Sequence, residues 1–269
     1  MKRPGQASAG HKLHWEAHPG NGPCLLLVHG FLMSRAQWLL NLEALGTVCR
    51  PVVVELWGHG RSPAPMDAVD YQPEALIEQF DLIRCELGEQ HWLLCGYSLG
   101  AGLTLRYALD RPQQTIAHVF TNSTSALADE AQQAAWLEQG LASRQRFSNE
   151  GMPAIDRIAV HPRHAKHLPA SVKIPLLADA ARHTPLGIAN IMAYTTPQLS
   201  VRSRIHTNTR PALLIQGQRE TRFNPFADHV RAHMPRLDCI RLDTGHGVNM
   251  EDANGFNQAL IAFVRQHST

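Results

Sequence analysis

Residues Gly96-Tyr97-Ser98-Leu99-Gly100 match the pattern G-x-S-x-G, which is common when it is taken alone. Here it follows residues 91–95, an apolar run that predicts a short buried strand, and it leads into residues 100–109, whose spacing predicts a helix. A serine on such a sharp turn needs small neighbours because the backbones crowd there, and the helix points its partial positive charge at the reacting centre. The context therefore predicts that Ser98 is a nucleophile. The alternative is a glycine-rich turn with no chemistry.

The segments on either side of this turn alternate between strand and helix. The predicted strands are residues 24–28, 50–56, 91–95, 116–120, 212–215 and 237–242, and the predicted helices are residues 36–45, 73–87, 100–109 and 255–266. Such alternation is typical of a mostly parallel central sheet with right-handed crossovers and helices on both faces. We therefore expect an α/β fold.

The alternation lapses between residues 125 and 209. That segment holds helical patches at 129–147 and 172–182, many prolines and histidines, and no convincing strand. We interpret residues 125–209 as a helical cap inserted into one core domain, which residues 1–124 and 210–269 form. The alternative is a long mobile surface excursion, but structureless loops of that length are uncommon in compact domains.

A second motif, His29-Gly30-Phe31-Leu32, directly follows the first strong strand. At strand–turn–helix serine sites, one oxyanion donor is the N–H of the residue after the nucleophile, and the other comes from the loop after an earlier strand. These positions correspond to Leu99 and Phe31. Two such donors stabilise the negative oxygen of a tetrahedral intermediate. We interpret His29 itself as a buried histidine that orders the loop.

The general base is predicted from its place in the chain. Among sixteen histidines, His246 lies in Asp243-Thr244-Gly245-His246-Gly247, after the last predicted strand and before the last helix. The acid that orients such a base falls between the nucleophile and the histidine. Glu220 is the best candidate, because a carboxylate there can accept from the imidazole and stabilise the imidazolium. Asp228 and Asp243 are weaker candidates, and a solvated loop glutamate is the alternative reading of Glu220.

Composition argues against several other classes of protein. The 269 residues are 44% hydrophobic, and the net charge of +2 gives no reason to expect nucleic acid or an anionic membrane as a partner. The five cysteines form no C-x-x-C pair, residues 1–6 lead into no apolar signal segment, and no apolar run could span a membrane. We expect a cytoplasmic monomer or homodimer that acts on a small-molecule substrate, with no nucleic-acid or membrane partner.

Residues 161–167 contain three histidines, His161, His164 and His167, at spacings that resemble a metal-ligand cluster. The neighbouring Arg163 and Lys166 disfavour a cation, and no carboxylate lies nearby in the sequence. We therefore interpret this run as a solvated face of the cap and expect no metal. The chain has no dinucleotide-binding fingerprint after a strand, no P-loop and no H-E-x-x-H motif, so we expect no cofactor.

Together these motifs resemble the α/β-hydrolase superfamily over nearly the whole chain. The resemblance rests on the joint order of His29-Gly30-Phe31, Glu55-Leu56-Trp57-Gly58-His59-Gly60-Arg61-Ser62, the Ser98 turn and Gly245-His246. The family usually has aspartate at the place of Glu55, a change that we expect to matter little for the chemistry. The resemblance implies the α/β-hydrolase fold with a serine nucleophile, a catalytic triad and an oxyanion hole.

Within the superfamily the chain looks most like the branch that contains 2-succinyl-6-hydroxy-2,4-cyclohexadiene-1-carboxylate synthase. Gly217-Gln218-Arg219-Glu220-Thr221-Arg222-Phe223 is similar to the acid loop of that enzyme, with glutamate for aspartate, and Tyr97 before the serine also fits. The synthase branch uses cap arginines to hold a multiply anionic substrate. The resemblance therefore makes Tyr97, Arg144, Arg146 and Arg182 the substrate-binding candidates of this chain.

On these grounds we expect hydrolysis of a small ester, thioester or lactone through an acyl-enzyme, with Ser98, His246 and Glu220 as the triad. The first alternative is a proton-abstracting lyase of the synthase type, in which Ser98 and His246 act as a base without an acyl-enzyme. The second is a catalytically silent binding protein on the same fold. Retention of all three triad residue types argues against this second alternative.

Overall fold

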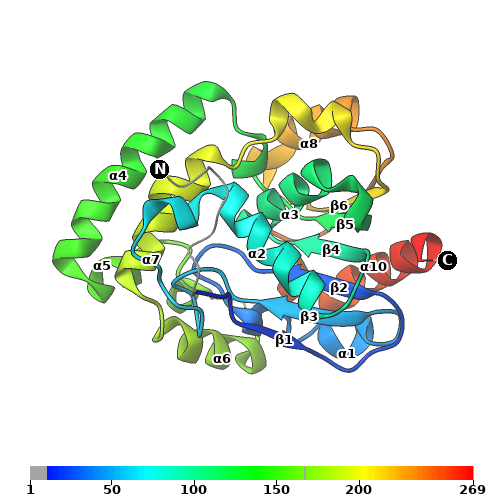
Figure 1. Ribbon diagram of the computed structural model, residues 1–269, viewed down its shortest axis with the longest axis horizontal. Helices are drawn as coiled ribbons and strands as arrows, with labels where there is room; N and C mark the ends of the chain where they lie inside the picture. The colour runs from blue at the N-terminus through cyan, green and yellow to red at the C-terminus, as the bar shows by residue number, and fades with distance from the viewer. Residues whose placement is uncertain (1–10, 167, 269) are drawn as a thin grey trace.

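The computed structural model describes residues 11–166 and 168–268 (Figure 1). Residues 1–6, on which the expectation of no secretory signal depends, and His167 lie outside the described residues. Within these described residues, seven strands form one sheet in the order β1-β3-β2-β4-β5-β6-β7. Only β1 runs antiparallel to its neighbour, so the mostly parallel sheet that the sequence predicts is confirmed. The strands are β1 (Trp15–Ala17), β2 (Cys24–Val28), β3 (Arg50–Val54), β4 (Trp92–Gly96), β5 (Thr115–Phe120), β6 (Ala212–Gly217) and β7 (Leu237–Leu242).

Helices cover both faces of this sheet. Successive side chains of a strand point to opposite faces, so Leu25 and Leu27 of β2 pack in the cluster that includes Phe256 and Leu260, while Leu26 packs in the cluster on the other face. All residues of β2 and β4 are buried, as their continuous apolar runs predict. The helices of the core are α1 (Leu42–Leu45), α2 (Pro73–Glu86), α3 (Leu99–Asp110), α8 (Asn224–His233), α9 (Val248–Glu251) and α10 (Ala253–His267).

The chain between β5 and β6 forms a helical insertion, a name used here for residues 125–207. Its main helices are α4 (Glu130–Glu150), α5 (Met152–Asp156), α6 (Ala170–Ala180) and α7 (Pro185–Asn190), and a π-helical turn, η6 (Ile191–Thr195), follows α7. Figure 1 shows these helices gathered beyond one end of the sheet. No described residue of the insertion pairs in the sheet. The division of the chain into a core and a cap at residues 125 and 209 remains a prediction.

The remaining elements are short helical turns. One of them lies where the sequence predicted part of a longer helix. The helix expected over residues 36–45 is a 3₁₀ turn, η1 (Arg35–Trp38), followed by the separate α1. Asn41 lies at the break, and its amide donates to the Asn249 carbonyl at 3.2 Å and to Asn257 Oδ1 at 2.8 Å. The remaining 3₁₀ turns are η2 (Ala68–Tyr71), η3 (Pro112–Gln114), η4 (Ser125–Leu127), η5 (Pro162–His164), η7 (Thr196–Gln198), η8 (Arg202–Thr207) and η9 (Thr221–Phe223). Across the described part of the chain, every helix is too short or too polar to cross a membrane.

Gly100 marks the closest approach between α3 and the end of β2. A Cβ atom at this position would lie 2.3 Å from the Val28 carbonyl oxygen and 2.6 Å from that of His29. These contacts involve backbone, which cannot move aside without shifting β2 or α3. A side chain at position 100 would therefore separate the serine turn from the loop that follows β2.

We expect Gly100→Ala to lower the free energy of unfolding by roughly 2 kcal/mol or more, because the added methyl overlaps backbone atoms. The matched control is Gly88→Ala, where φ is +73° and nothing lies within 4 Å of an added Cβ, so only backbone strain of about 1 kcal/mol is expected. Urea unfolding followed by circular dichroism measures both variants. Equal stability of the two would contradict the proposed backbone contact.

Candidate active site

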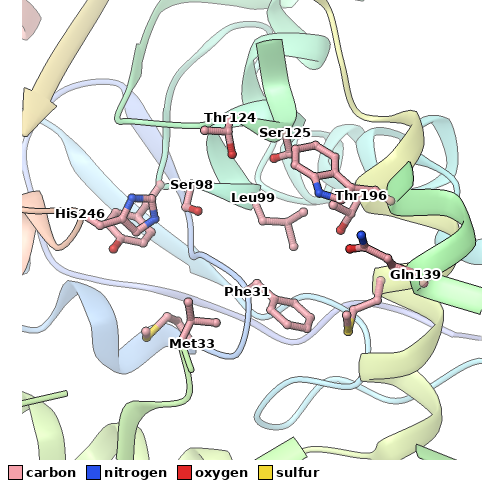
Figure 2. A pocket seen from close by; sticks show the side chains of 14 residues that line it. Phe31, Met33, Ser98, Leu99, Thr124, Ser125, Gln139, Thr196 and His246 are labelled. Carbon is pink, nitrogen blue, oxygen red and sulfur yellow. The ribbon is translucent and has the colours of Figure 1, made fainter. Parts of the chain in front are cut away.

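Ser98 lies at a strained turn between β4 and α3. Its φ of 52° and ψ of −112° are unusual for a residue other than glycine. The turn is held by two hydrogen bonds, from the Ser98 N–H to Thr121 Oγ1 at 3.3 Å and from the Gly100 N–H to the Tyr97 carbonyl at 2.8 Å. Such strain persists only where the surrounding structure fixes it, and it is typical of functional sites. The turn presents the Ser98 side chain to a cavity (Figure 2).

His246 and Glu220 are directly hydrogen bonded. The imidazole Nδ1 lies 2.7 Å from Glu220 Oε2, although 26 residues separate the two side chains. Glu220 follows β6 and His246 follows β7, so the parallel pairing of these strands brings both side chains to the same end of the sheet. With Nδ1–H donating to the carboxylate, Nε2 is the basic nitrogen of the ring.

Two further donors hold the Glu220 carboxylate. Asn122 Nδ2 donates to Oε2 at 2.9 Å, and Arg222 Nε donates to Oε1 at 3.1 Å. Asn122 also bonds both backbone groups of Gly217, each at 3.1 Å. The amide therefore fixes the end of β6 and the acid together. The sequence analysis did not single out Asn122, although a polar run directly after the buried strand β5 is a signal that could have found it.

The loop that carries His246 is held by Glu251, which the sequence analysis also missed. Glu251 Oε2 accepts from the Gly245 N–H at 2.8 Å, and Oε1 accepts from the Gly247 N–H at 3.1 Å. The two amides lie on either side of His246, so one carboxylate fixes the loop at both flanks. Arg219 donates to the same carboxylate at 2.9 Å.

The weaker candidates for the acid lie elsewhere. Asp228 is on α8 and accepts from Arg231 at 2.5 Å, and Asp243 is exposed, with Arg219 at 3.8 Å. Neither forms a hydrogen bond or ion pair with His246 in the described structure. The acid that the fold brings to His246 is thus Glu220.

Phe31 and Leu99 both line the same cavity as Ser98. His29, which is fully buried, donates from Nδ1 to the Gly30 carbonyl at 2.7 Å and accepts at Nε2 from the Leu56 N–H at 3.0 Å. Burial lowers the pKa of His29 to about 3, so the ring is neutral. The Gly30 carbonyl belongs to the same peptide group as the Phe31 N–H. His29 therefore fixes the direction in which that N–H points.

The cavity beside Ser98 has a volume of about 380 Å³ and lies between the sheet end and the helical insertion. Figure 2 shows Ser98 and His246 on one side of it, with Gln139 and Thr196 on the other. Among the described residues, no Asp, Glu, Lys or Arg side chain lines this cavity. The lining consists of Phe31, Met33, Tyr97, Ser98, Leu99, Thr124, Ser125, Trp136, Gln139, Gly140, Val160, Met192, Thr196 and His246.

Of the substrate-binding candidates predicted from the sequence, Tyr97 lines the cavity and the three arginines do not. Tyr97 lines the cavity, and its ring lies 5.2 Å from the His246 ring. Arg144 Nε instead donates to Asn190 at 2.9 Å, Arg146 is exposed over the Phe147 ring, and Arg182 is exposed. None of these three arginines is among the residues that line the cavity. Their direction depends on how α4 and α6 pack, which the sequence pattern does not specify.

A smaller cavity of about 220 Å³ adjoins the first and shares Met33, Tyr97, Val160 and His246 with it. The histidine run of the insertion lines this second cavity. His161 is buried and lies 3.5 Å from Asp156, so the expectation of a solvated face is corrected at this residue, whereas His164 is exposed. In residues 11–166 and 168–268, no group of three or more His, Cys, Asp or Glu side chains is arranged to hold a metal ion.

The comparison with known proteins agrees with this geometry. A family model described as alpha/beta hydrolase fold matches residues 23–253. The chain therefore belongs to the α/β-hydrolase family, and the fold and the family predicted from the sequence are confirmed. The family match assigns the chain as a hydrolase, and its curated relatives include methyl ester esterases.

Three individual similarities are informative. A putative 2-succinyl-6-hydroxy-2,4-cyclohexadiene-1-carboxylate synthase of Bacillus subtilis is 22% identical over 91% of this chain and 92% of its own length. A pimeloyl-[acyl-carrier protein] methyl ester esterase of Nitrosomonas europaea is 25% identical over 82% of this chain and 87% of its own. The solved structure of MenH from S. aureus superposes with a TM-score of 0.82 at 18% identity, covering 95% of this chain and 99% of that chain. The resemblance to the synthase branch is thus confirmed.

The hydrogen bonds to Glu220 predict an unusual titration. Burial by itself raises the pKa of this carboxyl, but the bonds from His246, Asn122 and Arg222 outweigh burial and lower the pKa from 4.5 to about 2. The NMR signal of the Glu220 carboxyl carbon can be assigned because it is missing from the spectrum of Glu220→Gln. We expect this signal to titrate near pH 2. Asn122→Ala removes one donor and is expected to raise that midpoint.

Because the pKa of Glu220 in the folded state is below its unfolded value, ionised Glu220 stabilises the fold above about pH 4.5. This stabilisation is lost as the pH falls through about 2. A midpoint at or above 4.5 in the wild type would contradict the hydrogen-bond network described here.

Proposed function

We propose that this protein hydrolyses small, uncharged carboxylic esters, thioesters or lactones through an acyl-enzyme on Ser98. The observation that carries the proposal is the meeting of Ser98 with the His246–Glu220 pair at one cavity. A strained serine, a histidine with its basic nitrogen free to accept a proton, and a carboxylate on the other nitrogen are the parts that nucleophilic acyl transfer requires.

In the proposed reaction, His246 Nε2 takes the proton of Ser98 as the serine oxygen attacks the substrate carbonyl carbon. The carbonyl π electrons move to oxygen, and the Phe31 and Leu99 N–H groups stabilise that oxyanion. When the tetrahedral intermediate collapses, the bond to the leaving group breaks and His246 returns the proton to it. Water then attacks the acyl-enzyme with the same proton transfers, which releases the acid and restores Ser98.

Glu220 has two roles in this proposal. Its hydrogen bond keeps the proton of neutral His246 on Nδ1, so that Nε2 is the nitrogen that can act as the base, and its charge stabilises the imidazolium that forms. The carboxylate is well suited to the second role, because Asn122 and Arg222 keep it ionised in a site where it is only 9% exposed. Glutamate therefore fills the position that the family more often gives to aspartate.

The lining of the cavity supports the restriction to uncharged substrates. A volume of about 380 Å³ is in the range of small-molecule sites. A carboxylate that entered it without a cationic partner would lose its hydration with no compensation, which costs several kcal/mol. No lysine or arginine of the described part of the chain lines it. Apolar groups such as Phe31, Leu99 and Trp136 instead suit an alkyl or aryl acyl group.

A proton-abstracting lyase is the second candidate, favoured by the similarity to the putative synthase of Bacillus subtilis. In such a reaction Ser98 and His246 would act as a base and no acyl-enzyme would form. An anionic substrate of the kind implied by the name of that relative needs cationic groups in the site. The uncharged lining of the cavity makes hydrolysis the better-supported reaction.

The test of the acyl-enzyme begins with Ser98→Ala. We expect the loss of p-nitrophenyl ester turnover to be on the order of 10^4, because the nucleophile is removed, while circular dichroism stays unchanged. The wild type is expected to be labelled at Ser98 by a fluorophosphonate, and to show a burst of nitrophenol if deacylation is the slower step. Turnover within about tenfold of wild type in Ser98→Ala would contradict the mechanism.

The same assay separates the two candidate reactions. Failure to hydrolyse short acyl esters, together with rapid conversion of the succinyl-cyclohexene carboxylate precursor, would overturn the hydrolase proposal. Loss of that conversion in Arg144→Ala, Arg146→Ala or Arg182→Ala would then show that arginines outside the cavity reach the substrate after all.

Glu220→Gln tests the acid. We expect kcat to fall roughly 100-fold or more, with KM changed less than about threefold, because the amide cannot stabilise the imidazolium and favours the wrong tautomer. Asp228→Asn is the matched control, since this carboxylate binds Arg231 on α8. Near wild-type kcat in Glu220→Gln, with an inactive Asp228→Asn or Asp243→Asn, would show that another acid serves His246.

A further inference from the structure

Leu32, in the loop after β2, has a strained backbone conformation. Its φ of 59° is in the left-handed region, although leucine is neither glycine nor asparagine, and its side chain is fully buried. Both of its backbone polar groups are bound by histidines. The N–H donates to His59 Nε2 at 3.1 Å, and the carbonyl accepts from His183 Nε2 at 3.2 Å.

Three consecutive peptide groups of this loop are thus held by three buried histidines. His29 donates to the Gly30 carbonyl, in the peptide that carries the Phe31 N–H; His59 accepts from the Leu32 N–H in the next peptide; and His183 donates to the Leu32 carbonyl in the third. His29 and His59 belong to the core, whereas His183 lies in the helical insertion, between α6 and α7.

His183 uses both ring nitrogens. While Nε2 donates to Leu32, Nδ1 accepts from the Gly60 N–H at 3.3 Å, and the residue is only 4% exposed. Its ring lies 5.0 Å from that of His59. Burial lowers the pKa of His183 to about 4, so at pH 7 the ring is neutral, which is the state that both hydrogen bonds require. The ring therefore joins the loop after β2 to the loop after β3.

The same part of the insertion contacts these loops at two other points. Ser34 Oγ donates to Asp179 Oδ2 on α6 at 2.8 Å, and Asp179 is 5% exposed. The Thr184 N–H donates to the Gly58 carbonyl at 3.0 Å. Residues 179–184 are therefore fixed against both loops, and His183 is the one that reaches the backbone carbonyl of Leu32.

We propose that His183 is a positioning residue for the oxyanion hole, through which the helical insertion supports the strained loop whose Phe31 N–H is oriented by His29. This inference rests on the proposed function, since the oxyanion forms only if the protein performs acyl transfer. Without His183, the carbonyl of the strained Leu32 loses its hydrogen bond. Relaxation of its φ turns the Phe31–Leu32 peptide. This peptide shares the Phe31 Cα with the peptide that carries the Phe31 N–H, so the N–H is displaced from the oxyanion. Substrate binding, which depends on the apolar lining, is little affected.

The test compares His183→Ala with His183→Gln, which can place an amide N–H near the position of Nε2. For a p-nitrophenyl ester we expect His183→Ala to lower kcat between tenfold and 100-fold, less than the roughly 100-fold or greater loss known for removal of a whole donor. KM is expected to change less than threefold, and His183→Gln is expected to recover most of kcat. His206→Ala, an exposed histidine of the insertion, is the matched control.

A second measurement separates positioning from general damage to the fold. A trifluoromethyl ketone forms a tetrahedral adduct with serine, whose oxyanion occupies the hole, whereas the corresponding methyl carbinol binds without forming one. We expect His183→Ala to weaken the ketone about as much as it lowers kcat/KM and to leave the carbinol within twofold. If His183→Ala fails to fold, His183→Asn replaces it, because the asparagine amide is too short to reach Leu32.

Two results would overturn the inference, and they are distinguishable from failure of the proposed function. The first is a kcat within twofold of wild type in His183→Ala, or in His183→Asn if His183→Ala does not fold. The second is equal weakening of the ketone and the carbinol. In both cases the wild type still hydrolyses the ester and is labelled at Ser98. A wild type that shows neither activity nor labelling would overturn the proposed function itself.

Discussion

The close backbone contact between the serine turn and the end of β2 is the constraint on which the rest of the site depends. Gly100 brings α3 against the Val28 and His29 carbonyls, and a Cβ at Gly30 would lie 2.6 Å from the Tyr97 ring. These distances leave room for no side chain at either glycine. Ser98 and the loop that carries Phe31 are therefore held at a fixed separation, as the proposed oxyanion hole with donors from two segments requires.

The polar side chains that follow the other strands extend this constraint across the sheet. Because β5, β6 and β7 are parallel neighbours, Asn122, Glu220 and His246 emerge at the same end. Asn122 links the first two of these strands by bonding Gly217 and Glu220 at once. The hydrogen bond by which Asn122 helps to keep Glu220 ionised thus also fixes the end of β6 relative to β5. The Asn122 side chain therefore both stabilises the fold and lowers the pKa of Glu220.

The sequence predicted the parts of the site that depend on local pattern. Ser98 follows from a buried strand, a glycine-flanked turn and a helix, and His246 and Glu220 follow from chain order after predicted strands. Local pattern does not specify which distant side chains meet, so Asn122, 98 residues from Glu220, was missed. For the same reason the division of residues 36–45 at Asn41, which is set by partners more than 200 residues away, could not be foreseen.

The sequence did not predict which side chains of the helical insertion face the cavity, and the reason is physical. The direction of a side chain on α4 or α6 depends on how each helix docks, so counting arginines in the segment did not show which of them face the cavity. Arg144 bonds Asn190 within the insertion, whereas the uncharged Trp136 of the same helix lines the cavity. At its other end the insertion contacts the loops after β2 and β3 through Asp179 and His183. One inserted segment therefore provides the wall that would select the substrate and a contact that orders the loop beside the nucleophile. On the proposed function, we expect a change in its sequence to alter specificity and rate together without replacing Ser98, His246 or Glu220.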